Sequence, residues 1–237
     1  MIRIIFAITA LSFAFNLYWV AADPHWLILP AALVAWYIAD LTSGVVHMVM
    51  DYRPCTPGLG LKDLFFYEGS RGTEEYRKLF RQVMARVGPI ERIVFDFKNH
   101  HPRPNALGRR NLTFQIRSTV IFGSLPFSVL LNLACLAGHL SGWTIPGWFV
   151  AGAVVFFLGG TFSQYFHGTL HRDRNPWLVR AMRRLHLLIT PAAHDIHHAT
   201  LDRDFATING WSNPALNIVF DALRRRGHFP SSGLEPG

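Results

Sequence analysis

Histidines are the residues of this sequence with the clearest capacity for chemistry, since nine of the twelve are clustered. The nine are His47, His100, His101, His167, His171, His186, His194, His197 and His198. Spacings of three and four positions, as between His167 and His171 and within 194–198, place side chains on one helix face. Clustered imidazoles suit iron, zinc or copper, and nine exceed the ligands of one ion. The pattern therefore predicts two metal ions.

The carboxylates narrow the metal chemistry. The five glutamates, none of which adjoins a histidine cluster, are Glu68, Glu74, Glu75, Glu91 and Glu235. The Glu-x-x-His pairs of soluble di-iron bundles are therefore absent, as is the His-Glu-x-x-His helix of zinc proteases. What remains is a histidine-rich di-iron site of the membrane type. The isolated His25, His139 and His228 are interpreted as bystanders.

Four aspartates are candidates for supporting roles. Asp40, His47 and Asp51 fall on one stripe of a helix, with Asp40 about two turns (about 11 Å) from His47. An ionisable group inside a membrane is by default functional, although it also serves as a structural hydrogen bond between helices. Asp51 is expected to be a ligand or an acceptor that orients a histidine. Asp195 and Asp96 are weaker candidates of the same kind.

The histidines must be positioned by helices that cross a membrane. Four apolar blocks are each long enough to span about 30 Å of hydrocarbon, at residues 4–22, 26–50, 118–140 and 145–166. A cleaved signal peptide is the alternative for the first block, but the aromatic residues near its end favour a membrane boundary. The sequence thus predicts an all-α, four-helix integral membrane protein in a single domain, 1–237.

The charges predict an orientation. All 23 Lys and Arg lie at Arg3, within 53–117 or within 172–226, whereas the two short connections have none. The positive-inside bias then places both termini, the loop 51–117 and the tail 167–237 in the cytoplasm. The nine clustered histidines lie on that side, in a histidine-rich helical cap. A net charge of +8 on a cytoplasmic membrane face requires no nucleic-acid partner.

Two segments of the cap have their own pattern. Apolar and basic residues alternate at helical spacing over 77–87, which predicts an amphipathic helix that either lies in the membrane interface or packs on neighbouring segments. Pro191 and Pro214 break the last stretch into short helices, and Asn213 is placed to cap the final one. Residues 231–237 are expected to be a loose tail.

Four ordered histidine elements resemble one lipid desaturase family. They are the stripe Asp40 to Asp51, the run Asn99-His100-His101-Pro102, the pair His167 and His171, and His186 to His198 ending in His194-x-x-His197-His198. The stretch Asn209 to Asn213 also resembles that family, and the resemblance extends from about Asp40 to Asp221. The family contains the plasmanylethanolamine desaturases, which make the vinyl ether of plasmalogens, and the plant plastid enzyme that desaturates palmitoyl-phosphatidylglycerol.

The resemblance implies the site and the reaction. It implies a metal-ligand set of His47, His100, His101, His167, His171, His194, His197 and His198, with His186 as a ninth. Asn99 occupies a position that is often Glu or Gln in the family and is a candidate for orienting a ligand. The implied cofactors are two iron ions that use O₂ on a phospholipid chain. We expect Arg103, Arg109 and Arg110 to contact the lipid head group.

Several functions fit these expectations. A plasmanyl-lipid desaturase comes first, and an acyl-lipid desaturase or hydroxylase of the same di-iron type is the alternative. From another class, a membrane metal transporter also carries histidines, whereas a zinc hydrolase lacks its glutamate and a cytochrome places histidines within the spans. The sequence has no flavin or nicotinamide fingerprint. Electrons are therefore expected from a separate partner, such as cytochrome b5 or ferredoxin with its reductase.

Overall fold

The computed structural model describes residues 1–236, and within that range the secondary structure is entirely helical. Four helical stretches of the described chain are long and apolar enough to cross a membrane. They are α1 (Ile2–Ala22), α2 (Ile28–Tyr52), the stretch Leu112–Leu140, and α9 (Gly147–Leu170). The third consists of α7 (Leu112–Thr119), the π-helical η1 (Val120–Ser124) and α8 (Leu125–Leu140). The prediction of an all-α fold with four candidate spans is confirmed.

The two membrane-span helices that carry histidines extend further towards the cap than the apolar blocks in the sequence. α2 has 25 residues and α9 has 24, so each is about 36 Å long, against about 30 Å of hydrocarbon. α2 continues past the expected residue 50, and α9 past residue 166, because the chain meets no helix breaker until Pro54 and the turn after His171. The extra turns carry polar ligands beyond the apolar part of each span.

Close packing fixes α2 against α9. A Cβ atom on Gly159 of α9 would lie 2.5 Å from the Ala39 Cβ of α2, so the glycine permits an approach that a larger residue would block. The other pair, α1 and α8, is joined by buried polar side chains. The Ser12 and Ser128 hydroxyls lie 2.7 Å apart, and Asn132 Nδ2 donates to the Ser12 carbonyl at 2.9 Å.

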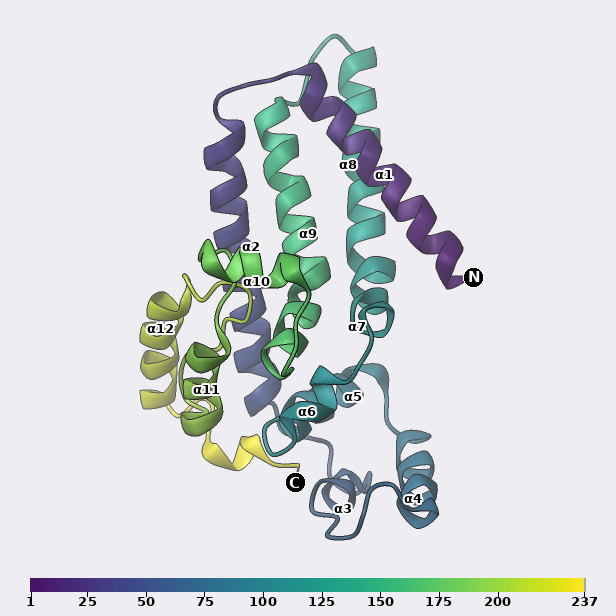
Figure 1. Ribbon diagram of the computed structural model, residues 1–237, viewed down its shortest axis with the longest axis vertical. Helices are drawn as coiled ribbons and strands as arrows, with labels where there is room; N and C mark the ends of the chain where they lie inside the picture. Colours follow the sequence, from purple (N-terminus) through teal and green to yellow (C-terminus); the bar gives the residue numbers. More distant parts are fainter. Residues whose placement is uncertain (237) are drawn as a thin grey trace.

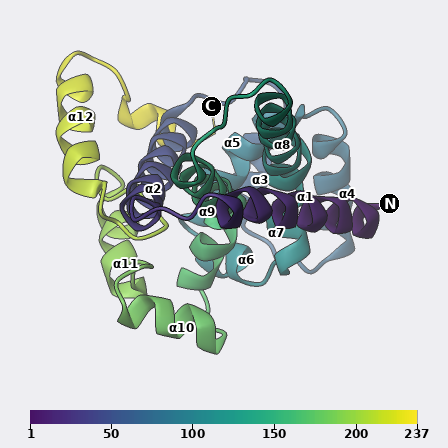
Figure 2. The ribbon, with the colours of Figure 1, turned by 90° about the horizontal axis from the view of Figure 1, so that it is seen from above.

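A helical cap, residues 53–111 and 171–236, covers one end of the spans (Figure 1). Its first part contains α3 (Leu61–Phe65), α4 (Glu74–Met84), α5 (Pro89–His100) and α6 (Pro104–Gly108). Its second part contains α10 (Trp177–Arg184), α11 (Pro191–Thr200), α12 (Asn213–Arg225) and the 3₁₀ turn η2 (Ser231–Leu234). Viewed along the spans, the two parts lie on opposite sides of α2 and α9 (Figure 2).

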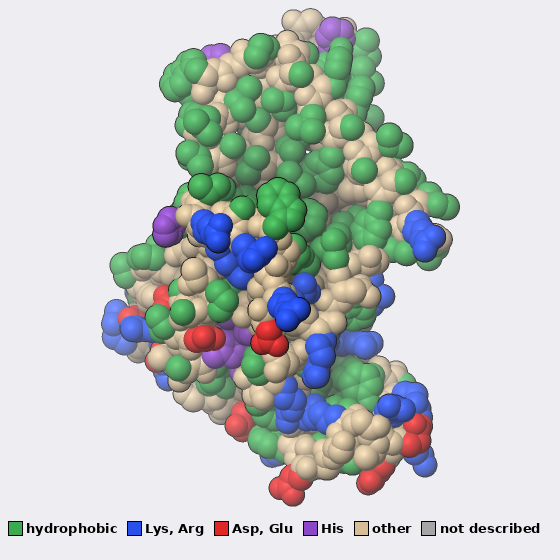
Figure 3. All heavy atoms as spheres, in the orientation of Figure 1, with side chains coloured by type: hydrophobic (Ala, Val, Ile, Leu, Met, Phe, Trp, Pro, Cys, Tyr) green, Lys and Arg blue, Asp and Glu red, His purple; other side chains and the backbone are tan. Residues whose placement is uncertain are grey.

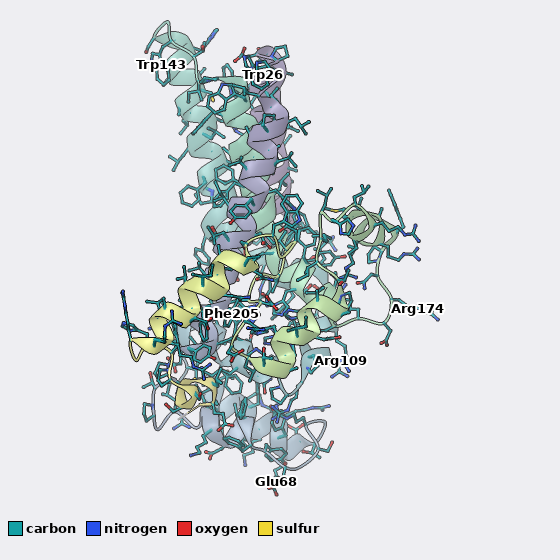
Figure 4. All side chains as sticks on the ribbon, turned by 90° about the vertical axis from the view of Figure 1, so that its left-hand side faces the viewer. Trp26, Glu68, Arg109, Trp143, Arg174 and Phe205 are labelled. Carbon is teal, nitrogen blue, oxygen red and sulfur yellow. The ribbon has the colours of Figure 1, made fainter. Side chains whose placement is uncertain are left out.

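The surface of the spans and the surface of the cap carry different kinds of side chain. Hydrophobic side chains cover the upper part of the molecule, and Lys, Arg, Asp and Glu gather over the cap (Figure 3). Trp26 and Trp143 lie at the far end of the spans, Glu68 at the tip of the cap, and Phe205 between them where spans and cap meet (Figure 4). Both tryptophans are exposed, as is typical of a membrane boundary.

The structure decides between the two interpretations of the 77–87 helix. Leu79, Phe80 and Met84 of α4 pack on a core that includes Leu61 and Val94. α4 also lies far from the spans in Figure 1. It is therefore an ordinary packing helix and not an interfacial one.

The C-terminal segment differs from the expected loose tail. Phe229 and Leu234 pack against Met48, Tyr52 and Phe220, and Gly233 is buried. The segment is fixed because aromatic rings of α2 and α12 leave an apolar surface that it covers. The helix-capping expectation is off by one residue, since Asn213 is the first residue of α12 and Ser212 precedes it.

Candidate metal centre

Two groups of side chains converge where the spans meet the cap. The first contains five histidines, and the second contains three histidines and one aspartate; within each, the ligand atoms lie within 4.8 Å of one another. The first group is His100, His167, His171, His194 and His198. The second group is His47, Asp51, His101 and His197. Eight of the nine histidines singled out in the sequence thus meet, divided between two neighbouring sites.

Four helices bring these residues together. α2 provides His47 and Asp51 one turn apart, and α9 provides His167 near its end. Consecutive residues at the end of α5, His100 and His101, point into different groups. On α11, His194 and His198 face the first group, and His197 faces the second. The spacing of the histidines on α11 therefore supplies side chains to both groups.

Backbone carbonyls fix the tautomers of three histidines. His47 Nδ1 lies 2.8 Å from the Phe205 carbonyl, and His197 Nδ1 lies 2.8 Å from the Arg203 carbonyl. His100 Nδ1 contacts the Phe97 carbonyl in the same way. Since a carbonyl only accepts, Nδ1 carries the proton in each ring. Each Nε2 lone pair is then free to point at a metal.

The separations of the ligand atoms fit bound cations. His167 Nε2 and His194 Nε2 are 3.1 Å apart, and His101 Nε2 and His197 Nε2 are 3.2 Å apart. Two nitrogens bound to one ion at about 2.1 Å are separated by about 3.0–3.4 Å. Asp51 Oδ2 lies 3.4 Å from His47 Nε2 and 3.3 Å from His197 Nε2.

These buried atoms have no other partner. Within residues 1–236, the buried side-chain atoms of the two groups that lack a hydrogen bond are His47 Nε2, both Asp51 carboxylate oxygens, His100 Nε2, His171 Nε2, His194 Nδ1 and His198 Nε2. Oxygen and nitrogen lone pairs facing one another in a buried space are unfavourable unless a cation lies between them. The donor set therefore fits two metal ions, one in each group.

Burial keeps the histidines of the cap neutral. Loss of solvation, and secondly the neighbouring imidazoles, lower the pKa of His101 to about 2 and that of His171 to about 3. The pKa of His198 falls to about 4, mainly through burial and secondly through His197. Burial also lowers the pKa values of His100 and His194 well below 6.5. Neutral imidazole is the form that binds metal.

These pKa shifts predict loss of stability in acid. Below pH 6.5 the histidines of the unfolded chain take up protons, while the folded chain resists until pH falls to about 4 or lower. Stability is therefore highest above about pH 7 and falls as pH drops towards about pH 5. The unfolding midpoint of the purified protein in detergent, measured across this range, tests the prediction. A midpoint that stays constant or rises on acidification would contradict it.

His186 and Asp195 lie at the surface and outside both groups. His186 is exposed in the turn after α10, with φ of 55°, because the chain reverses there and directs the ring away from the centre. The nine side chains that converge therefore include Asp51 and not His186, which was expected as the ninth ligand. Asp195 is exposed on α11 and belongs to neither group, since its neighbours His194 and His197 face inward.

Asp40 has a structural role instead of a place at the metal groups. Its Oδ1 accepts hydrogen bonds from the backbone N–H groups of Ile208, Asn209 and Gly210, at 3.1, 2.8 and 3.1 Å. Its Oδ2 accepts from the Ser212 N–H at 3.1 Å and the Ser212 hydroxyl at 2.7 Å. The intramembrane charge is thus satisfied by the loop that follows α11, which explains the Asn209 to Asn213 stretch.

That loop in turn orients the ligands. It contains the Phe205 and Arg203 carbonyls that hold His47 and His197. Asn213 Oδ1 also accepts from the Ala206 N–H at 2.8 Å. Asp40 therefore acts on the metal groups indirectly, by fixing the backbone that fixes two rings.

The remaining candidates make contacts next to the groups. Asn99 Oδ1 accepts from Arg71 at 3.3 Å and from Arg103 at 2.9 Å, so it ties the cap together beside His100. Arg110 forms a two-pronged ion pair with Asp96, at 3.0 and 3.1 Å. Arg103 and Arg110 are therefore both held within the protein, and Arg109 is exposed.

One supporting residue carries no signal in the sequence. The side chain of Lys98 is fully buried, and its ammonium donates to the Asp51 and Gly233 carbonyls. It joins the end of α2, where the Asp51 ligand lies, to the C-terminal segment. In the sequence, a lysine two residues before a histidine pair is indistinguishable from an ordinary surface lysine. Only the three-dimensional structure shows that Lys98 is buried.

A small cavity borders the first group. It has a volume of about 20 Å³, and His100 and His167 form one side of it. Phe97, Gln164 and the Asp96–Arg110 pair form other parts of its wall. A space of this size holds about one water-sized molecule.

The fold and the paired groups define a class of helical membrane protein with a histidine-rich cluster, able to hold metal ions, at one end of its candidate spans. A family model for the lipid desaturase domain matches residues 87–224, and the chain belongs to that family. It is 27% identical over 195 residues to the plasmanylethanolamine desaturase of Myxococcus xanthus, an alignment that covers 82% of this chain. The chain spans 57% of the length of that relative. No solved structure matches the chain.

Proposed function

We propose that this protein is a membrane lipid desaturase that uses two iron ions and O₂ to form the vinyl ether bond of plasmalogens from a plasmanyl phospholipid. The observation that carries the proposal is the pair of buried ligand groups at the end of the spans. Family membership and the similarity to a plasmanylethanolamine desaturase support the choice of reaction. We propose further that residues 1–237 act as one desaturase domain.

The proposed ligands are the eight converging histidines and Asp51. Nitrogen-rich ligation of this kind suits iron, and nine donors over two ions leave positions open. Iron bound there would supply the oxidising power, drawn from O₂, to remove two hydrogen atoms from a saturated carbon–carbon bond. Reducing one O₂ to two waters needs four electrons, and the lipid provides two. The other two come from a separate donor, such as cytochrome b5 or ferredoxin with its reductase.

The residues of the chain hold and shield the site. Phe205, Arg203 and Phe97 carbonyls keep three imidazoles in the ligand tautomer. The cavity beside His100 and His167 has room for about one water-sized molecule. The lipid chain reaches this region from the bilayer, with its head group on the basic side of the cap.

The proposed orientation puts the cap in the cytoplasm. Lys and Arg are found in the cap, in α7 at the cap end of the third span and near the N-terminus, while the connections at the opposite end have none. Both termini and the metal groups then lie on the cytoplasmic side. This is also where a soluble electron donor and its reductase are available.

Lipid analysis tests the proposed reaction. We would express the wild type and His198→Ala in a host supplied with alkyl-ether phospholipid and profile the lipids by mass spectrometry before and after acid treatment. Acid-labile vinyl ethers that form only with the wild type are expected. A new acyl double bond with unaltered ether lipids would move the protein to acyl-lipid desaturation. Added oxygen on the chain would indicate hydroxylation instead.

A further inference from the structure

Helix α10 leaves an apolar face without a partner in the described chain. Trp177, Leu178 and Leu185 are 72%, 54% and 68% exposed. Positions 177, 181 and 185 recur at intervals of four and lie on one side of the helix, with 178 beside them. Exposed tryptophan and leucine side chains gathered on one short helix mark an interaction surface rather than chance exposure.

The opposite face of α10 is firmly attached to the protein. Val179 is buried in a core with Ala39, Leu188 and Ile208. Arg183 donates to the Ile189 carbonyl and to the Thr169 hydroxyl, both at 3.0 Å. α10 is therefore a fixed part of the fold, and its outer face does not close onto another described segment.

The position of α10 identifies what covers that face. Figure 1 shows α10 lying across α2 and α9, at the same height along the spans as the N-terminal end of α1. Figure 3 shows hydrophobic side chains at this level that continue the apolar surface of the spans, with Lys and Arg directly beside them. The exposed Arg180 and Arg184 flank the apolar face. Apolar anchors next to arginines at a membrane boundary are the pattern of an interfacial helix.

We propose that α10 lies in the membrane interface, with Trp177, Leu178 and Leu185 inserted among lipid chains and Arg180 and Arg184 against lipid phosphates. In the sequence, α10 lies between His171 and His194, two members of the first group. The proposal concerns membrane contact alone and does not depend on the reaction proposed above.

Spin labels measure the depth of this helix in lipid nanodiscs. Labels at Leu178→Cys and Leu185→Cys would be compared with Leu130→Cys on the exposed side of α8 and Glu75→Cys on α4. The native Cys55 and Cys135 are buried, which favours labelling of the introduced thiols. We expect both α10 labels to be accessible to O₂ and protected from a water-soluble nickel chelate, at a depth of about 5–10 Å.

Two outcomes would overturn the proposal. The first is that the nickel chelate reaches the labels at positions 178 and 185 as readily as the label at position 75. The second uses unlabelled protein and the conservative variant Trp177→Phe, so that it does not depend on the cysteine variants folding. In nanodiscs, brominated lipid should quench the emission that Trp177 contributes, taken as wild type minus Trp177→Phe, since Trp177 would contact lipid chains. If brominated lipid left this difference emission unquenched, insertion of the Trp177 side chain would be contradicted.

Discussion

Replacing Asp51 with asparagine is expected to abolish lipid desaturation and to lower bound iron from about two ions to about one per chain. Asp51 is the single carboxylate in the two groups within residues 1–236. Its oxygens lie 3.3–3.5 Å from His47, His101 and His197 Nε2 atoms. Asparagine keeps the shape of the side chain but removes the charge that offsets a bound cation. The second group would then lose its ion, while the five histidines of the first retain theirs.

A matched control uses the other aspartate close to the ligands. Asp195 lies next to His194 on α11 but is exposed and belongs to neither group. Asp195→Asn should therefore keep both iron content and activity. Mass spectrometry would measure the iron content of both variants, and lipid profiles of the same preparations would measure their activity. The two variants should differ in both quantities. Full iron and activity in Asp51→Asn would exclude Asp51 as a ligand.

Replacing Asp40 with alanine is expected to destabilise the fold severely, by at least about 4 kcal/mol, because each buried donor left unpaired costs about 1–3 kcal/mol. Four backbone N–H groups of residues 208–212 lose their acceptor in this variant. The loop that orients His47 and His197 is then released. Loss of iron should follow from loss of structure, and it should be accompanied by a large fall in the unfolding midpoint in detergent.

Asp23 provides the control for Asp40. It is also an aspartate that accepts a hydrogen bond from another helix, from the Gly147 N–H at 2.8 Å, but it makes a single such bond and is exposed. Asp23→Ala should shift the midpoint only slightly. If Asp40→Ala and Asp23→Ala had equal midpoints, Asp40 would not hold the loop as we infer.

The helices and most of the centre could be predicted from the sequence. Long uncharged blocks indicate spans regardless of tertiary context, and the spacing of His194, His197 and His198 indicates one helix. Helix ends were less accurate, because α2 and α9 continue beyond the apolar residues that reveal them. The division of the histidines into two groups depends on how α5 and α11 meet, which no local pattern encodes.

The supporting residues could not be predicted for a different reason. The partners of Asp40 lie 168 to 172 positions away in the sequence. The carbonyls of Phe205 and Arg203 act through the backbone, so the residue types give no indication. His186 has the right residue type but lies in a turn that directs it outward. The spacing of His186 cannot reveal this direction, because it depends on how α10 packs.

The metal content of the purified wild-type protein tests the central claim most directly. Each group of converging ligands is proposed to hold one iron ion. Elemental analysis should therefore find about two iron ions per chain, with little zinc or copper. Two ions in the wild type and about one in Asp51→Asn would agree with paired iron sites. Zinc as the main metal, or a single ion unaffected by Asp51→Asn, would contradict the proposed centre.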